Sequence, residues 1–138
     1  MVRDVLNKLS IAFAAGCFGG LLNSLVVWAF GAYGLSGALG VAISPPLTAQ
    51  WLYPRIVWGG IWGWLFFIPF KKSRPVQRGL LFSLGPTLVM LLVVFPYQLH
   101  KGLFGLKLGL LTPLLVAVFN AVWGLGAVAW LRWVHRRS

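Results

Sequence analysis

The chain has 138 residues, 59% hydrophobic and 9% charged, and its twelve Lys and Arg face one acid, so the net charge is +11. Soluble domains carry about 25% charged residues, so this composition cannot cover a water-exposed surface and predicts a protein that resides in lipid. The length suits one transmembrane domain, residues 1–138. The basic residues form short clusters between apolar runs, which argues against nucleic-acid binding and for charge that flanks a membrane.

The first apolar run covers residues 9–30 and follows Arg3 and Lys8. Its about 22 residues exceed the about 7 to 15 of a cleavable signal peptide, so we expect a retained helix. Such a helix would reach roughly 33 Å, which is enough to cross the hydrocarbon core. The following stretch, residues 31–43, is glycine-rich and uncharged. It is expected to form an extracytoplasmic loop or to re-enter the membrane under cover of protein or water.

The second span is expected over residues 45–70, and it carries the sharpest polar feature of the chain. Ser44 is the predicted N-cap and Pro45 the predicted first helical residue. Pro54 predicts a kink. Arg55 then lies about one third of the way into this span, near its outer end.

Spans three and four are expected over residues 79–97 and 113–133. Pro86 predicts a bend in the third span, and Thr112 and Pro113 are the expected cap and first residue of the fourth. The loop before span three is strongly basic and contains Lys71, Lys72, Arg74 and Arg78. The predicted fold class is therefore an all-α four-transmembrane-helix bundle.

The distribution of Lys and Arg predicts the orientation of the bundle. The two termini and the 71–78 loop carry most of these residues: Arg3, Lys8, Lys71, Lys72, Arg74, Arg78, Arg132, Arg136 and Arg137. The opposite side has Lys101 and Lys107, with Arg55 near the interface. Because positive loops stay inside, we expect a multi-pass protein of the bacterial inner (plasma) membrane with both termini cytoplasmic. Its expected lipid partners are the anionic headgroups of the inner leaflet.

Small residues at four-residue spacing predict close helix contacts, since they let two backbones approach in lipid. The residues expected at these contacts are Ala12, Gly16, Gly20, Gly59, Gly63 and Gly124.

The two halves of the chain also resemble each other in order. Residues 20–25 match 79–84, 44–47 match 112–114, and 55–59 match 120–124. Two parallel helical hairpins related by an internal repeat would explain this, and the match pairs Arg55 with Asn120.

Most catalytic chemistries lack their residues. Asp4 is the only acid, so carboxylate acid–base catalysis and proton transport through a buried carboxylate are unsupported. His100 and His135 are expected at opposite ends of the bundle, which prevents one chain from ligating a haem with both. The lone Cys17 supports neither an intrachain disulfide nor a metal cluster. We therefore expect no enzyme activity, no cofactor and no metal.

Arg55 has two interpretations. It is an anion, lipid-phosphate or carboxylate site, or it is an interfacial anchor whose head reaches water or caps carbonyls freed at Pro54. Likewise, Asn23 and Asn120 either line a small pathway or fix helix packing through hydrogen bonds. The candidate ligand-binding residues are Arg55, Gln50, Tyr53, Asn23, Ser24 and Asn120. An aromatic ligand among Trp58, Trp62 and Trp123 is a further interpretation.

Two functions follow from these observations. The first is a non-enzymatic accessory or assembly subunit of a membrane complex, which associates with itself or with another membrane protein. Its support is the absence of catalytic groups together with the small-residue stripes. The alternative is a small channel or transporter for an anion or a neutral solute that uses Arg55 and the buried Asn residues. The glycine-rich stretch 31–43 and the repeat support this alternative.

Overall fold

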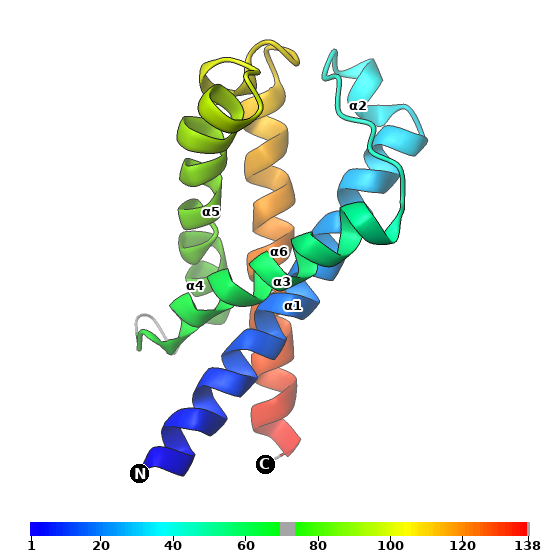
Figure 1. Ribbon diagram of the computed structural model, residues 1–138. Helices are drawn as coiled ribbons and strands as arrows, with labels where there is room; N and C mark the ends of the chain where they lie inside the picture. The colour runs from blue at the N-terminus through cyan, green and yellow to red at the C-terminus, as the bar shows by residue number, and fades with distance from the viewer. Residues whose placement is uncertain (70–73, 138) are drawn as a thin grey trace.

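The computed structural model describes residues 1–69 and 74–137, and in this part the protein is all-helical, without strands. Both termini lie at one end of the bundle, and the connections 33–48 and 99–111 lie toward the other (Figure 1). The elements are α1 (Val2–Ala32), α2 (Leu35–Ala38), α3 (Ala49–Gly63), η1 (Trp64–Phe67), α4 (Pro75–Phe82), α5 (Leu84–Val89), η2 (Met90–Gln98), η3 (Leu103–Gly105) and α6 (Thr112–Arg137).

Three helical segments in the described residues are long and apolar enough to cross a membrane, namely Val2–Ala32, Pro75–Gln98 and Thr112–His135. They contain the predicted spans 9–30, 79–97 and 113–133 and extend beyond each. Their length and composition are compatible with a membrane protein, since about 20 apolar residues cross the hydrocarbon core.

The third span is interrupted near its prolines. α4 ends at Phe82, α5 begins at Leu84, and the turn widens into the π-helix η2 from Met90 onward. A proline lacks the N–H for its own helical bond and its ring crowds the carbonyl four residues earlier. For Pro86 that carbonyl belongs to Phe82, which is where α4 ends. The predicted bend therefore takes the form of a break between two short helices.

The predicted second span is wrong as a single helix over residues 45–70. Residues 41–48 are extended, and α3 has only 15 residues before the 3-10 turn η1. At 1.5 Å per residue, α3 reaches about 22 Å, short of the about 30 Å hydrocarbon core. It crosses α1 obliquely instead of running parallel to α6 (Figure 1). Within the described residues, three helical segments and not the predicted four are therefore long and apolar enough to cross a membrane.

The start of α3 explains this difference. Its N-cap is Thr48, whose Oγ1 accepts a hydrogen bond from the Trp51 backbone N–H at 3.2 Å, and not the predicted Ser44. A residue that precedes proline is pushed out of the helical region. Pro45 precedes Pro46, so a helix that begins at Pro45 is disfavoured, and α3 begins only at Ala49. The part of this segment that precedes α3 is consequently extended chain.

The extended segment is covered by protein. Val41 is buried in a cluster with Val27, Leu115 and Phe119. The Ala42 backbone N–H donates to the Leu108 carbonyl at 2.9 Å. These contacts fix the extended chain against α1 and α6, and so set where α3 can begin.

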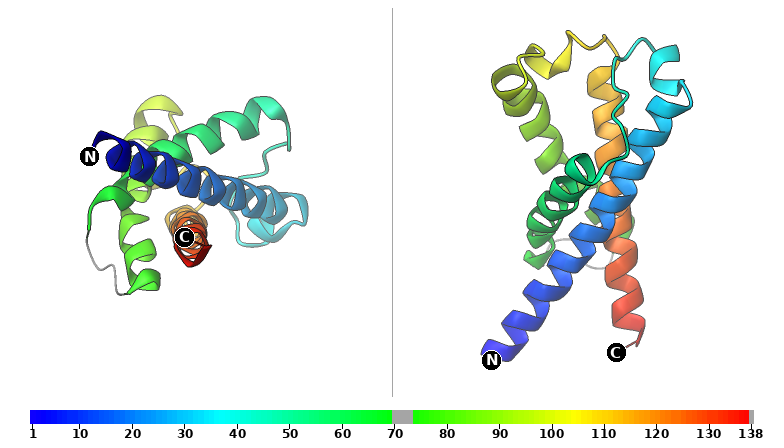
Figure 2. Two further views of the ribbon diagram at one scale, coloured as in Figure 1. Left: turned by 90° about the horizontal axis from the view of Figure 1, so that it is seen from below. Right: turned by 45° about the vertical axis from the view of Figure 1, so that its right-hand side comes forward.

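Glycines bring α3 against α1. A Cβ placed on Gly16 would lie 2.2 Å from the Gly59 carbonyl oxygen, and one placed on Gly63 would lie 2.4 Å from the Ala12 carbonyl oxygen. α1 lies between α3 and α6 when the bundle is viewed along its length (Figure 2). Only glycine permits backbones this close, so this contact fixes the register of α3 on α1.

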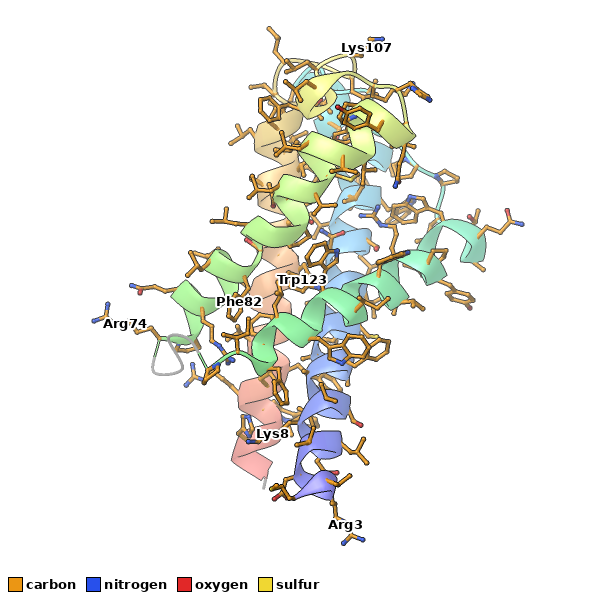
Figure 3. All side chains as sticks on the ribbon, turned by 60° about the vertical axis from the view of Figure 1, so that its left-hand side comes forward. Arg3, Lys8, Arg74, Phe82, Lys107 and Trp123 are labelled. Carbon is orange, nitrogen blue, oxygen red and sulfur yellow. The ribbon has the colours of Figure 1, made fainter. Side chains whose placement is uncertain are left out.

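A second glycine contact joins α4 to α6. A Cβ on Gly124 would lie 2.1 Å from the Gly79 carbonyl oxygen. Beside it, Phe66 and Trp123 form a buried cluster against which Phe82 packs, and the labelled Phe82 and Trp123 point into the interior (Figure 3). This cluster fills the half of the bundle nearer the termini.

The charged residues that the structure describes lie mostly at the ends. Arg3 and Lys8 lie toward the end that carries the termini, and Lys107 lies at the opposite end (Figure 3). Arg78, predicted in the basic loop, lies on α4 and donates to the carbonyls of Phe66 and Ile68. Lys71 and Lys72 of that loop, and the side chains of Arg136 and Arg137, lie outside the described residues.

Candidate functional site

The centre of the site is the guanidinium of Arg55, which α3 brings against α1. Its Nε donates to Ser24 Oγ at 3.0 Å, and its Nη2 donates to Asn23 Oδ1 at 2.7 Å. These two nitrogens form one edge of the planar group. The indole of Trp51, one turn earlier on α3, lies 4.7 Å from the guanidinium carbon and stacks on its face. The side chain is therefore held in one orientation by three contacts: two hydrogen bonds to α1 and the indole ring of Trp51.

The other edge of the guanidinium remains open. In the described part of the chain, Nη1 and the second N–H of Nη2 have no acceptor, and Nη1 is not enclosed by protein. An arginine carries five N–H donors in a fixed fork. Two are taken by α1, which leaves three, and two of these, one from each Nη, point along the Nη1–Nη2 edge that matches a carboxylate or phosphate.

A chain of hydrogen bonds extends from Arg55 across the bundle. Asn23 Nδ2 donates to the Phe119 carbonyl at 2.6 Å and to Asn120 Oδ1 at 3.3 Å. Asn120 Nδ2 in turn donates to Thr87 Oγ1 at 3.1 Å. The network thus links α3, α1, α6 and α5 through buried or half-buried side chains, and each link fixes the next one.

Backbone packing explains why such short side chains can reach one another. A Cβ on Gly20 would lie 3.0 Å from the Arg55 carbonyl oxygen, so α3 passes directly over α1 at this level. Ser24 Oγ also donates to the Gly20 carbonyl at 2.7 Å, which aims its lone pairs at Arg55. The glycine stripe and the polar network are therefore parts of one arrangement.

The positive charge of Arg55 has no internal counter-ion. The only acid of the chain is Asp4, which lies 19 residues before Asn23 on the same helix, or about 28 Å along its axis. Ser24 and Asn23 supply neutral acceptors, which solvate a cation without cancelling its charge. Removing a charge from water without pairing it is costly, so this site is poised to accept an anion.

A cleft of about 750 Å³ opens beside the free edge of Arg55. Its walls come from α1, the extended segment, α3, α5, η2 and α6. Four of the eight tryptophans of the chain line it: Trp51, Trp58, Trp62 and Trp123. Arg55, Asn23, Asn120, Ser44 and Gln98 provide its polar groups. A cleft of this size with few convergent polar groups falls within the about 300–1,000 Å³ range of small-molecule sites.

The structure separates the predicted site residues into two groups. Asn23, Ser24, Asn120 and Arg55 come together in the network, whereas Gln50 and Tyr53 are exposed and do not line the cleft. Within the described residues, the hydrogen bonds of Arg55 go to the α1 side chains Ser24 and Asn23, not to carbonyls freed at Pro54. Gln50 and Tyr53 are close to Arg55 in sequence, but closeness in sequence does not determine the direction in which a side chain points.

Three further residues join the site. Trp51 stacks on Arg55, Gln98 lines the cleft, and the indole N–H of Trp123 donates to the Gly59 carbonyl at 3.2 Å. Trp51 lies four residues before Arg55 on a predicted helix, so helical spacing was the available signal. The sequence named Trp123 only as part of an aromatic site with Trp58 and Trp62. Gln98 gave no such signal, because its segment and α3 are brought together only by the fold.

The lining residues of the cleft determine what it could bind. Comparisons with protein-family models, with curated proteins and with solved structures found no match for this chain. Within the described residues, no three His, Cys, Asp or Glu side chains gather in one place. The chemically distinctive group of the cleft is the cation on Arg55.

Proposed function

We propose that this protein is a multi-pass membrane protein that binds an anionic ligand in the cleft beside Arg55. The observation that carries the proposal is the open Nη1–Nη2 edge of a guanidinium whose other edge is fixed by Ser24 and Asn23. An acceptor with two oxygens fits this edge in bidentate geometry. The role is one of binding, without covalent chemistry.

The shape of the interior favours binding over open conduction. On the side of Arg55 nearer the termini, Trp123 bonds to the Gly59 carbonyl, and Phe66, Ala15 and Ala127 pack around it. Glycine contacts close the remaining space between the helices. A conducting pore needs a continuous polar or wettable path, whereas this cleft ends at an apolar plug. Transport of the predicted kind would therefore proceed by a carrier mechanism that moves this plug.

The location proposed for the protein is the bacterial inner membrane, with both termini cytoplasmic. The support is the common end shared by the termini (Figure 1), together with Arg3 and Lys8 near that end (Figure 3). In this orientation the cleft lies in the outer half. Ser24 is eight residues, or about 12 Å, below the outer end of α1.

The accessory-subunit role rests on the same missing counter-charge. A carboxylate on a helix of a partner, or of a second copy, would also pair with Arg55 in lipid. One turn of a helix about 10–12 Å wide and 5.4 Å long occupies roughly 400–600 Å³. The cleft of about 750 Å³ holds fewer than two such turns, so its size favours a small ligand over a partner helix.

An internal duplication is proposed on matching contacts. The sequence match aligns Gly20 with Gly79 and Gly59 with Gly124. In the fold, a Cβ on Gly59 would lie 3.0 Å from Gly20 Cα, and Gly124 meets Gly79 in the same manner. Each hairpin thus closes on its own corresponding pair. The ligand cleft lies where the two hairpins face each other, as in transporters built from repeats.

Anion binding is tested by tryptophan fluorescence, because half of the tryptophans line the cleft. Protein in neutral-lipid nanodiscs is titrated with acetate, inorganic phosphate, oleate and dodecyl phosphate. We expect at least one anion to produce a saturable change that Arg55→Gln weakens about tenfold or more. Lys107→Gln removes an exposed charge outside the cleft and is the matched control. Equal titrations for wild type and Arg55→Gln with all four anions would refute the proposal.

Liposome flux then separates a carrier from a binding subunit. The anion that binds is loaded into liposomes containing wild type or Arg55→Gln. Efflux that occurs with wild type and is lost with Arg55→Gln would identify the protein as a carrier. Binding without flux, together with a stable complex with another membrane protein, assigns a ligand-dependent subunit.

A further inference from the structure

We propose that the ligand of Arg55 is a single-chain anionic amphiphile, a long-chain carboxylate or phosphate monoester, which enters sideways from the lipid between α3 and the α5–η2 segment. This inference rests on the proposed anion-binding function and specifies the class of its ligand. Three features of the cleft support it: its single cation beside a long apolar wall, its opening toward the apolar surface, and its depth.

The cleft combines one cation with a long apolar wall. The cation is Arg55, flanked by Asn23 and Asn120, and Ser44 and Gln98 are the other, neutral, polar groups of the cleft. Its wall consists of Val27, Val89, Met90, Val94, Phe95, Val116 and Phe119. All of these lie on the side of the network that is farther from the termini. They follow Asn23 on α1 or Thr87 on α5 and η2, or they precede Asn120 on α6. A small hydrophilic anion would leave this wall unfilled, whereas an apolar chain matches it.

The opening of the cleft lies between two segments that do not pack along their lengths. α3 packs on α1, and η2 packs mainly on its own neighbours η3 and α5, with few contacts to α6. Trp58 on α3 is 61% exposed and Val89 on α5 is 37% exposed, yet both line the cleft. The cleft therefore reaches the surface between them.

The surface around this opening is apolar. Val57 beside Trp58 and Leu88 beside Val89 are both exposed. In a membrane such residues face hydrocarbon, so the opening leads directly from the lipid to Arg55. The wide turn of η2 borders it, and π-helical turns occur frequently at functional sites.

The depth of Arg55 favours a ligand with a chain. A free anion has to leave water and pass the apolar wall to reach the guanidinium, which is unfavourable. An alkyl chain on the anion makes entry from the membrane favourable, because each CH₂ that leaves water raises membrane partitioning about fourfold. The chain concentrates the headgroup in the lipid, and the free edge of Arg55 then selects its charge.

The experiment compares three probes that share parts of one molecule. Protein in neutral-lipid nanodiscs is incubated with oleate, oleyl alcohol or acetate, and bound ligand is counted by native mass spectrometry and by tryptophan titration. We expect saturable oleate binding, with oleyl alcohol and acetate each at least about tenfold weaker. Arg55→Gln should weaken oleate binding about tenfold or more, and Arg55→Lys should weaken it less, since the charge remains.

Two matched variants test the lateral route. Val89→Trp fills the opening from α5, whereas Leu88→Trp adds the same bulk on the adjacent exposed residue outside the cleft. We expect Val89→Trp to lower oleate occupancy and to slow its uptake about tenfold, and Leu88→Trp to bind as wild type. Unchanged occupancy and uptake in Val89→Trp would overturn the lateral route.

The outcomes distinguish a failure of the amphiphile proposal from a failure of the proposed anion binding. Acetate binding as tight as oleate binding, and lost in Arg55→Gln, would overturn the amphiphile while leaving the anion site intact. Oleate and oleyl alcohol binding equally, with no effect of Arg55→Gln, would overturn both, because the cleft would then select chains without selecting charge.

Discussion

Replacing Gly16 by alanine tests the contact that places Arg55 against α1. A Cβ at Gly16 would lie 2.2 Å from the Gly59 carbonyl oxygen, 2.7 Å from Gly63 Cα and 2.9 Å from Gly60 Cα. All three atoms are backbone, so rotation of a side chain cannot relieve the overlap. The helices must separate by about 0.8 Å before the closest of these contacts reaches the 3.0 Å that Cβ atoms require.

This separation affects both stability and the site. Overpacking of a close contact costs about 1–3 kcal/mol. A shift of about 0.8 Å also carries the Arg55 Nη2–Asn23 Oδ1 distance from 2.7 Å toward about 3.5 Å, beyond the about 2.7–3.2 Å range of N–H···O bonds. We therefore expect Gly16→Ala to lower the free energy of unfolding and to weaken anion binding together.

The assay is an SDS titration in mixed micelles, with helix content read by circular dichroism. Gly37→Ala is the control, because Gly37 lies in the short helix α2 with no atom within 4 Å of its added Cβ. Both substitutions carry a helix-propensity gain of about 1 kcal/mol, so the difference between them reports the overlap. Unfolding free energies within about 0.5 kcal/mol of each other would refute the close contact of α1 and α3.

Three further predictions follow from the same contacts. Thr48→Ala should lower the unfolding free energy by about 1 kcal/mol, and Ser44→Ala by less than about 0.5 kcal/mol, in the same titration; equal losses would contradict a helix that begins at Ala49. A double-mutant cycle of Asn23→Ala with Arg55→Gln should give a coupling of about 0.6–1.7 kcal/mol, and strict additivity would contradict the hydrogen bond between them. Reporter domains fused to both termini should stay inside the cell while Lys107→Cys reacts with an impermeant maleimide from outside; any other combination contradicts the proposed orientation.

Local patterns in the sequence predicted the three helical segments that are long and apolar enough to cross a membrane. The apolar runs 9–30, 79–97 and 113–133 fall within long helices because backbone hydrogen bonding within a helix is satisfied by near neighbours. The four-residue spacing of Gly16 and Gly20 predicted a close helix contact, and in the fold both glycines lie on the face of α1 that meets α3.

The structure of residues 45–69 could not be predicted in the same way. Its apolar residues suggested one helix over 45–70, but the consecutive prolines Pro45 and Pro46 hold the outer part extended, and α3 begins only after Thr48. Extended chain at this position is stable because Val41 and the Ala42 backbone find partners on other helices. Those partners are distant in sequence.

By itself, the sequence determined that this is an apolar, basic, helical chain with a cation, Arg55, inside the predicted second span, because composition and short-range periodicity are properties of neighbouring residues. Only the tertiary structure decided that Asn23 and Ser24 hold one edge of that cation, that Asn120 and Thr87 extend the network, and that the other edge faces a cleft. These contacts join residues on separate helices, and their distances depend on how closely glycine lets those helices approach.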